Sequence, residues 1–128
     1  MNPKELGLCY LATPYTLYPS GTVNAFLQAA HLAAELLKLG YNIYSPIVHS
    51  HPITRHLDCS GIDWVEFHTP LMDAAKTLIV GKMFDWESSV GVANEIKYFS
   101  KQRKPIYYID PITLVIHDRW TYDSCGNS

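Results

Sequence analysis

Residues 77–109, TLIVGKMFDWESSVGVANEIKYFSKQRKPIYYI, contain the pattern that decides the fold. Residues 77–80 have the β-branched, apolar character of a buried strand, and residues 105–109 predict another strand. Between them, residues 88–103 are predicted to form a helix that is capped by Ser88 or Ser89. A strand, a helix and a strand in immediate succession are typical of two parallel strands joined by a right-handed crossover.

The remainder of the chain repeats this alternation. Further strands are predicted at residues 7–13 and 41–45, with a candidate short strand at 114–116. Residues 23–39 predict a helix that stops at Gly40. Residues 46–62 are rich in His, Ser and Pro, and we expect them to form a long loop. A second helix is predicted at residues 63–75 with Asp63 as its cap; Pro70 either kinks it or begins it, with Thr69 as the cap.

The pattern predicts one α/β domain over residues 1–117, followed by a polar tail over residues 118–128. We expect a three-layer, flavodoxin-like or Rossmann-like arrangement, in which helices cover both faces of a parallel sheet of four to five strands. With 128 residues, of which 48% are hydrophobic, the chain has material for one domain with a real core.

Composition and charge exclude several classes of function. The formal net charge of −2 gives no indication of binding to a nucleic-acid polymer or to an anionic membrane. No apolar run approaches the roughly 18 residues of a membrane span, and the N-terminus lacks the apolar stretch of a signal peptide, so we expect a cytoplasmic protein. The odd number of cysteines argues against a disulfide framework; they are Cys9, Cys59 and Cys125.

The sheet edge that binds ligands can be located from the sequence. In parallel α/β sheets, ligands bind beyond the carboxyl ends of the strands, which selects residues 13–21, 46–62 and 81–89. The helix that follows the last of these segments has free N–H groups at its start. Together with the hydroxyls of Ser88 and Ser89, they are suited to an anion such as phosphate. Gly91 has no side chain, so a ligand or a neighbouring strand can approach closely.

Glu95 is the unusual residue of this helix. The positions three and four residues away carry no cation; they are Gly91, Val92, Tyr98 and Phe99. The carboxyl group of Glu95 must therefore face a cavity, find a hydrogen-bond partner or be protonated. It is either a rim carboxylate in contact with solvent or a nucleophile for the anomeric carbon of a sugar, following the logic of retaining glycosidases.

The run Ser89-Val-Gly91-Val-Ala-Asn-Glu95 resembles the catalytic helix of the nucleoside 2-deoxyribosyltransferase superfamily, which includes nucleotide N-glycosidases that hydrolyse 5′-monophosphates. The opening Tyr10-Leu-Ala-Thr13-Pro14 is similar to the first strand and loop of these enzymes. The resemblance spans roughly residues 8–110, and it is to a little-characterised bacterial and phage branch of the superfamily.

The resemblance implies roles for individual residues. Glu95 matches the nucleophile that attacks C1′, and Tyr10 matches a strand tyrosine that hydrogen-bonds and orients this carboxylate. Ser89 matches a position that tends to be Asp in enzymes acting on free nucleosides and Ser in enzymes acting on 5′-monophosphates, because Asp would repel phosphate. Serine therefore favours a phosphorylated substrate, and the neutral helix start agrees with it.

The chain departs from this superfamily at the acid that assists the leaving base. Its members usually place an Asp at the start of the helix before the third strand, whereas the best register puts His68 there. Histidine can donate a proton near neutral pH, so acid assistance could survive. Asp63, Glu66 or Asp73 would substitute in another register. Loss of the acid would instead leave a protein that only binds nucleotide.

The remaining candidates for substrate contact are in the loops at the crevice: Thr13, Pro14, Tyr15, His49, His51 and Trp86. The two histidines could contact a base or phosphate, and the aromatic rings could stack on a base. Packing of these side chains onto the domain is the alternative. His49 and His51, with His56 and Cys59 nearby, lack a third ligand spaced as in common zinc sites, so no metal is expected.

The sequence thus predicts an N-glycosidase or 2′-deoxyribosyltransferase that acts on a nucleoside 5′-monophosphate and needs neither a cofactor nor a metal. The resemblance implies a homodimer or a larger homo-oligomer, in which a neighbouring subunit completes the site. One alternative is a non-catalytic nucleotide-binding or sensor domain on the same fold. Another is a glycohydrolase for a dinucleotide or a signalling nucleotide.

Overall fold

The computed structural model describes residues 2–57 and 61–118. Its centre is a five-stranded sheet in the order β2-β1-β3-β4-β5. The strands are β1 (Leu8–Ala12), β2 (Asn42–Tyr44), β3 (Thr77–Gly81), β4 (Ile106–Ile109) and β5 (Ile116–His117). This order is that of a common doubly wound α/β sheet, in which the ligand crevice lies where β1 and β3 are neighbours. The chain is therefore an α/β protein that is compatible with a Rossmann-like fold.

Strand direction agrees with the sequence prediction for four of the five strands. The pairs β1–β2, β1–β3 and β3–β4 are parallel. The fifth strand was expected at residues 114–116 as part of a parallel sheet, and here the prediction is wrong. The strand β5 pairs antiparallel with β4, with Ile109 opposite Ile116. Its direction reverses because Asp110 closes a tight turn by accepting hydrogen bonds from the N–H groups of Ile112 and Thr113.

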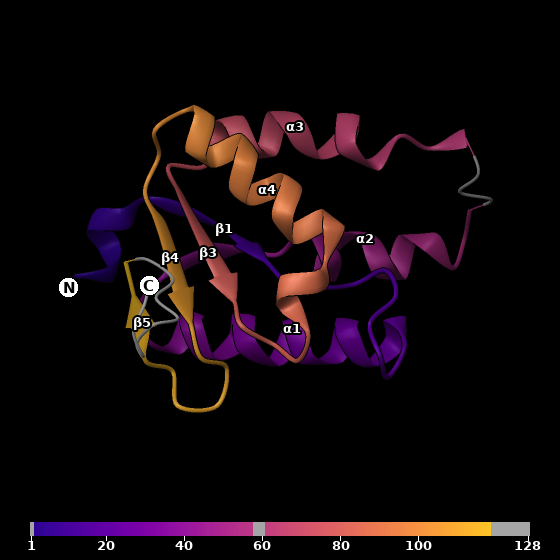
Figure 1. Cartoon of the computed structure of the whole chain (residues 1–128), viewed down its shortest axis with the longest axis horizontal. Helices are drawn as coiled ribbons and strands as arrows, with labels where there is room; N and C mark the ends of the chain where they lie inside the picture. The colour runs from indigo at the N-terminus through magenta and orange to yellow at the C-terminus, as the bar shows by residue number, and fades with distance from the viewer. Residues whose placement is uncertain (1, 58–60, 119–128) are drawn as a thin grey trace.

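Apolar side chains alternate between the two faces of the sheet along each strand. On one face, Tyr10 and Ala12 of β1 join a buried cluster with Met72 of α3 (Trp64–Ala74) and Phe99 of α4 (Val90–Lys101). On the other face, Cys9 and Leu11 pack with residues of α1 (Thr22–Lys38). Figure 1 shows α1 on one side of the strands and α3 and α4 together on the other side.

Local signals explain where these helices begin. The side chain of Asp63 accepts a hydrogen bond from the N–H of Glu66 and caps α3, so the first of the two predicted starts is correct. Pro70 lies inside this helix. The side chain of Ser89 caps α4 by accepting from the N–H of Val92, and Ser88 belongs to the preceding 3₁₀ turn η3 (Trp86–Ser88). A further 3₁₀ turn, η1 (Pro3–Leu6), precedes β1.

The segment predicted as a long loop contains a helix, α2 (Pro46–Thr54), so that prediction is wrong. Its start has two ordinary signals: Ser45 accepts a hydrogen bond from the N–H of Val48, and Pro46 occupies the first turn. Because His49 and His51 lie in this helix, their side chains point in different directions. Residues two apart lie on the same side of a strand but on different faces of a helix.

No helix within residues 2–57 and 61–118 is long and apolar enough to cross a membrane. Cys9 is a free, buried cysteine. Cys59, Cys125 and all but the first residue of the predicted polar tail lie outside the described residues.

Candidate active site

A pocket of about 780 Å³ opens at the carboxyl end of β1, between α3 and α4. It brings together the loop after β1, the start of α2, one face of α3 and the start of α4, so three separate predicted crevice segments contribute to it. Tyr10, Thr13, Pro14 and Tyr15 line it from β1 and its loop. The same pocket contains Ser88, Ser89, Gly91, Glu95 and His68.

Glu95 lies in the second turn of α4, and its side chain is partly buried at the wall of this pocket. Burial raises the pKa of the carboxyl group to about 8, and a hydrogen-bonding interaction with Tyr10 opposes this rise. A carboxyl group whose charged form is destabilised by its surroundings, and which faces a cavity, is typical of a functional site. Roughly a tenth of such groups are ionised at pH 7.

Tyr10 faces Glu95 from the centre of the fold. Its side chain is fully buried on β1, and its ring contacts Tyr44 and Phe99 at centroid distances of 5.9 and 5.8 Å. Burial raises the pKa of Tyr10 far above its usual value, and the nearby charge of Glu95 raises it further. The Tyr10 hydroxyl is close enough to Glu95 for each to shift the other's pKa, although their contact does not meet strict hydrogen-bond geometry.

A second buried hydroxyl in the pocket has no protein partner. Thr13 is 5% exposed, and its Oγ1 forms no hydrogen bond within the part of the chain that the structure describes. Leaving a buried polar atom unpaired costs about 1–3 kcal/mol. Gly81 leaves room for Thr13, since a Cβ atom at position 81 would lie 3.0 Å from Thr13 Cγ2. An unpaired donor at the wall of a pocket is suited to bind a polar ligand.

The start of α4 presents further donors. Because Ser89 Oγ accepts from the N–H of Val92 at 3.2 Å, its own hydroxyl hydrogen remains available to a ligand. The N–H groups of Val90 and Gly91 precede the first intrahelical hydrogen bond of α4. A Cβ atom at Gly91 would meet only Ser89 Oγ, at 3.9 Å, so this glycine leaves space for a ligand rather than for a neighbouring strand.

The segment that precedes α4 contributes a carboxylate to the pocket, whereas the sequence prediction treated the helix start as neutral. Asp85 lines the pocket and accepts a hydrogen bond of 3.0 Å from the Ser88 hydroxyl. Ser88 is therefore engaged within the protein, and Ser89 is the serine with a hydroxyl hydrogen to offer. Asp85 has φ of 64°, a left-handed conformation that Asp tolerates better than most residues.

Among the residues of α3 that line the pocket, His68 has the acid–base side chain. Burial lowers the pKa of His68, and the charge of His49 lowers it further. The three alternative acids do not line the pocket. Asp63 caps α3, Glu66 is exposed, and Asp73 accepts hydrogen bonds from Tyr98 and Gln102.

Three predicted contact residues are not brought to the pocket: His49, His51 and Trp86. His51 is buried against α1, where its ring stacks on Phe26 at 4.5 Å and its Nδ1 shares a 2.6 Å hydrogen bond with the Tyr15 hydroxyl. His49 is exposed on another face of α2. Trp86 is buried in the core beside Tyr108. A helix and a 3₁₀ turn replace the expected outward loops, so the rings of His51 and Trp86 are buried while that of His49 stays at the surface, away from the pocket.

Sequence reasoning missed several residues that line the pocket, among them Trp64, Thr69, Met72, Asp85, Asn94 and Tyr98. Three of them follow helical spacing from residues that were identified. Trp64 and Met72 lie four residues before and after His68, and Tyr98 lies three residues after Glu95. A helical projection from Glu95 and His68 would have found these three.

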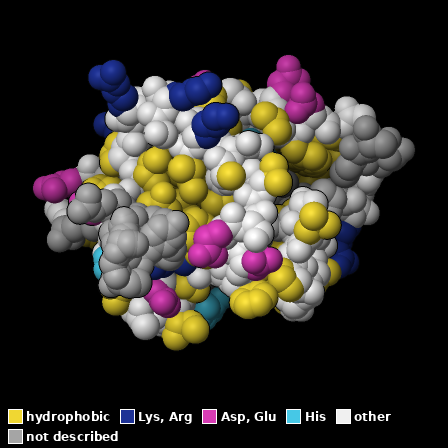
Figure 2. All heavy atoms as spheres, in the orientation of Figure 1, with side chains coloured by type: hydrophobic (Ala, Val, Ile, Leu, Met, Phe, Trp, Pro, Cys, Tyr) yellow, Lys and Arg dark blue, Asp and Glu magenta, His cyan; other side chains and the backbone are white. Residues whose placement is uncertain are grey.

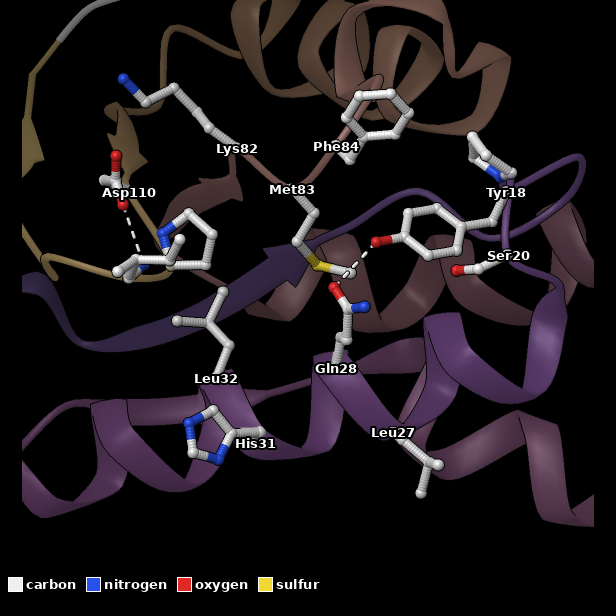
Figure 3. A pocket seen from close by; sticks show the side chains of 13 residues that line it. Tyr18, Ser20, Leu27, Gln28, His31, Leu32, Lys82, Met83, Phe84 and Asp110 are labelled. Atoms are coloured by element: carbon white, nitrogen blue, oxygen red, sulfur yellow. Dashed lines mark hydrogen bonds between the residues drawn. The ribbon is translucent and has the colours of Figure 1, made fainter.

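A second, larger hollow of about 970 Å³ lies on the α1 side of the sheet (Figure 3). Three of its polar side chains, Tyr18, Gln28 and Asp110, form hydrogen bonds within the protein. Tyr18 donates to Gln28 Oε1 at 2.8 Å, and Asp110 accepts from the N–H of Ile112 at 2.8 Å (Figure 3). It contains neither a buried carboxyl group with a raised pKa nor an unpaired buried hydroxyl among the residues described. We therefore place the candidate active site in the smaller pocket.

Within residues 2–57 and 61–118, no three His, Cys, Asp or Glu side chains lie close enough together to hold a metal ion.

The sequence model of a family described as "Domain of unknown function (DUF1937)" matches residues 7–123. A search of curated proteins finds no similar protein.

Proposed function

The chain belongs to this family of unknown function, and we propose that it cleaves or transfers the N-glycosidic bond of a nucleoside 5′-monophosphate. In this proposal Glu95 is the nucleophile, Tyr10 orients it, and His68 assists the departure of the base. The reaction needs no cofactor or metal. Its substrate is a small molecule rather than a nucleic-acid polymer, and no membrane is involved.

The observation that carries the proposal is the pairing of Glu95 with Tyr10 at the wall of the pocket. The carboxyl group comes from α4 and the phenol from β1, so the two groups meet between the helix and the sheet. Burial makes its charged form energetically unfavourable, as the pKa of about 8 indicates. Attack on an oxocarbenium-like carbon would neutralise that charge, so such a carboxylate is well suited to covalent catalysis at C1′.

The phosphate would bind at the start of α4. Ser89 offers a hydroxyl hydrogen, and the N–H groups of Val90 and Gly91 point from a helix N-terminus, where an anion is stabilised. The carboxylate of Asp85 lies nearby, held by Ser88. Like charges repel, so Asp85 sets a limit on how far the phosphate can extend along this wall.

The chemistry balances with these residues alone. An oxygen of the Glu95 carboxylate bonds to C1′ while the C1′–N bond breaks, and the base nitrogen keeps the electron pair and takes a proton from His68. Water then attacks C1′, passes its proton to His68 and releases the Glu95 carboxylate. If a second base attacks instead of water, the outcome is transfer.

The pocket rim supports the proposal of a homo-oligomer. Leu17, Val65 and Val90 line the pocket although their side chains are 91%, 69% and 73% exposed. Apolar side chains also gather in the middle of the face seen in Figure 2. A second copy of the chain that covers the rim would bury apolar surface and exclude water from the site.

The proposal includes the finer description of the fold as a three-layer, flavodoxin-like domain. Separate apolar clusters on the two faces of the sheet support it. A cytoplasmic location is also part of the proposal.

A non-catalytic nucleotide-binding domain is the second candidate. It is favoured by the charge states of Glu95 and His68, because the pKa of Glu95 is raised and the pKa of His68 is lowered. Near neutral pH this gives a mostly neutral carboxyl group and a mostly neutral imidazole. Calorimetric binding of a nucleotide without any release of base would support this candidate over the enzyme.

The experiment is to incubate the purified protein with ribo- and deoxyribonucleoside 5′-monophosphates and the matching free nucleosides, with and without a second free base. Chromatography then detects the released or exchanged base. We expect release from at least one monophosphate by the wild-type protein and none by Glu95→Gln. Absence of release from every compound, or equal release by Glu95→Gln, would overturn the proposal.

A further inference from the structure

The helix α2 places a serine between two histidines. Ser50 Oγ lies 3.2 Å from Nε2 of His68 on α3 and 3.4 Å from Nδ1 of His49, its neighbour in the chain. Ser50 is 8% exposed, whereas His49 is exposed to solvent and His68 lines the pocket. The three side chains therefore form a continuous path from solvent, through a buried hydroxyl, to the candidate active site.

The rings at both ends of this path are held by aromatic neighbours. His49 stacks on Phe67 at a centroid distance of 5.6 Å with an interplanar angle of 15°, and His68 stacks on Trp64 at 6.0 Å with an angle of 29°. A serine hydroxyl can accept a hydrogen bond from one partner while it donates its own hydrogen to another. Ser50 has the chemistry to pass a proton between two imidazoles.

We propose that His49 and Ser50 form a proton relay that supplies His68 from solvent during departure of the base. This proposal rests on the function proposed above. As His68 donates its Nδ1 proton to the base, His68 Nε2 takes the proton of the Ser50 hydroxyl, and Ser50 Oγ takes the Nδ1 proton of His49. His49 then recovers a proton from water. In the second step the same path runs in reverse and removes the proton of the attacking water.

The relay explains how a neutral histidine can act as an acid. Burial and the charge of His49 lower the pKa of His68, so His68 is mainly uncharged near neutral pH. A neutral imidazole can give up one proton readily only if its other nitrogen gains one at the same time. Tyr44 on β2 is the further titratable group that faces this cluster, with its ring 6.1 Å from His49, and burial raises its pKa.

Kinetics with two leaving groups separate the relay from a merely structural role. The natural base needs a proton to leave, whereas 4-nitrophenolate on the same sugar phosphate leaves as a stable anion. We expect Ser50→Ala and His49→Gln to lower kcat on the nucleotide by at least about tenfold. Both should keep the wild-type rate of the first turnover on the 4-nitrophenyl substrate, which reports departure of the leaving group before water attacks. Equal losses on both substrates, or no loss on either, would overturn the relay.

Matched controls are available on exposed parts of the chain. Ser100→Ala on α4 and His31→Gln on α1 remove the same groups at exposed positions outside the relay, and both should leave the two rates unchanged. If these controls also lost activity, the losses in Ser50→Ala and His49→Gln could not be assigned to the relay.

If the protein cleaves no nucleotide, the proposed function is refuted, and the relay must then be tested without catalysis. Nitrogen-15 NMR of the histidine rings reports which nitrogen carries the proton. We expect wild-type His68 to have a protonated Nδ1 and an Nε2 that accepts from Ser50, and Ser50→Ala to shift the Nε2 resonance. A protonated Nε2 in neutral His68, or a resonance insensitive to Ser50→Ala, would overturn the relay.

Discussion

The Tyr10 hydroxyl, on a strand in the interior of the sheet, lies beside the Glu95 carboxyl group on α4, and each group shifts the pKa of the other. Burial raises the pKa of Glu95 to about 8, and Tyr10 limits the rise. This contact joins the two sequence motifs that led to the proposed function, one on β1 and one on α4, and the first prediction tests it.

Removal of the Tyr10 hydroxyl should move the pH dependence of the reaction. Glu95 must be ionised to act as a nucleophile, so kcat/KM should rise about tenfold per pH unit and level off above pH about 8. Tyr10→Phe removes an interaction that lowers the pKa of Glu95, so the rise should shift to higher pH. Tyr107→Phe, the same change on β4, is the control. An unchanged pH profile in Tyr10→Phe would contradict the proposed orienting role.

Glu95 should lower the stability of the fold at alkaline pH. The pKa of this carboxyl group rises from 4.5 to about 8 on folding, so the folded protein holds a proton that the unfolded chain has released between these values. The free energy of unfolding contributed by Glu95 is therefore greatest below pH 4.5 and is lost as the pH rises to about 8.

Glu95→Gln should accordingly be more stable than the wild-type protein at pH 9, with little difference at pH 4. Urea unfolding at the two pH values measures this, and Glu66→Gln on the exposed surface of α3 is the control. A constant difference between Glu95→Gln and the wild-type protein would mean that the carboxyl group titrates normally.

Gly81, which packs beside Thr13, and Gly91, which lines the pocket, should respond in opposite ways to substitution by alanine. At Gly81 an added Cβ would lie 2.7 Å from Leu32 Cδ2, so Gly81→Ala should destabilise the fold by about 1–3 kcal/mol. At Gly91 the nearest atom would be 3.9 Å away, so Gly91→Ala should keep or slightly increase stability. Its methyl group would nevertheless narrow the proposed phosphate site and raise KM. Thermal unfolding and kinetics of both variants check this pair.

The serine at the start of α4 should decide between phosphorylated and free substrates. Asp caps a helix as well as Ser does, so Ser89→Asp should change the free energy of unfolding by no more than about 0.5 kcal/mol. Its carboxylate would repel phosphate. We expect at least about a tenfold fall in kcat/KM for the monophosphate and a relative gain for the free nucleoside. The ratio of the two rates of base release is the measurement, and an unchanged ratio would remove Ser89 from substrate recognition.

Sequence patterns predicted the elements that have a continuous apolar stripe. The strands β1, β3 and β4 and the helices α1, α3 and α4 lie close to their predicted positions, because burial on the sheet imposes a regular spacing on their apolar residues. The helix α2 was missed because it has no such stripe. Its buried residues include Ser50 and His51, which are covered by residues distant in the chain.

The same distinction applies to the site. Glu95, Tyr10 and Ser89 could be identified because their sequence motifs resemble a known catalytic helix and strand. The contact of His68 with Ser50 and that of His51 with Tyr15 could not be predicted from the sequence, because they depend on how α2 packs. The engagement of Ser88 by Asp85 follows from a 3₁₀ turn that the helical pattern alone does not indicate.

The central claim is that Glu95 forms a covalent bond with the sugar, and trapping that bond tests it most directly. A 2′-fluoro analogue of the cleaved nucleotide slows breakdown of the intermediate, because the fluorine destabilises the oxocarbenium-like transition state. Mass spectrometry of the quenched and digested protein should find the sugar phosphate attached to the peptide that contains Glu95, and no adduct on Glu95→Gln. Release of base from the analogue with an unmodified Glu95, or an adduct on a different residue, would contradict the account.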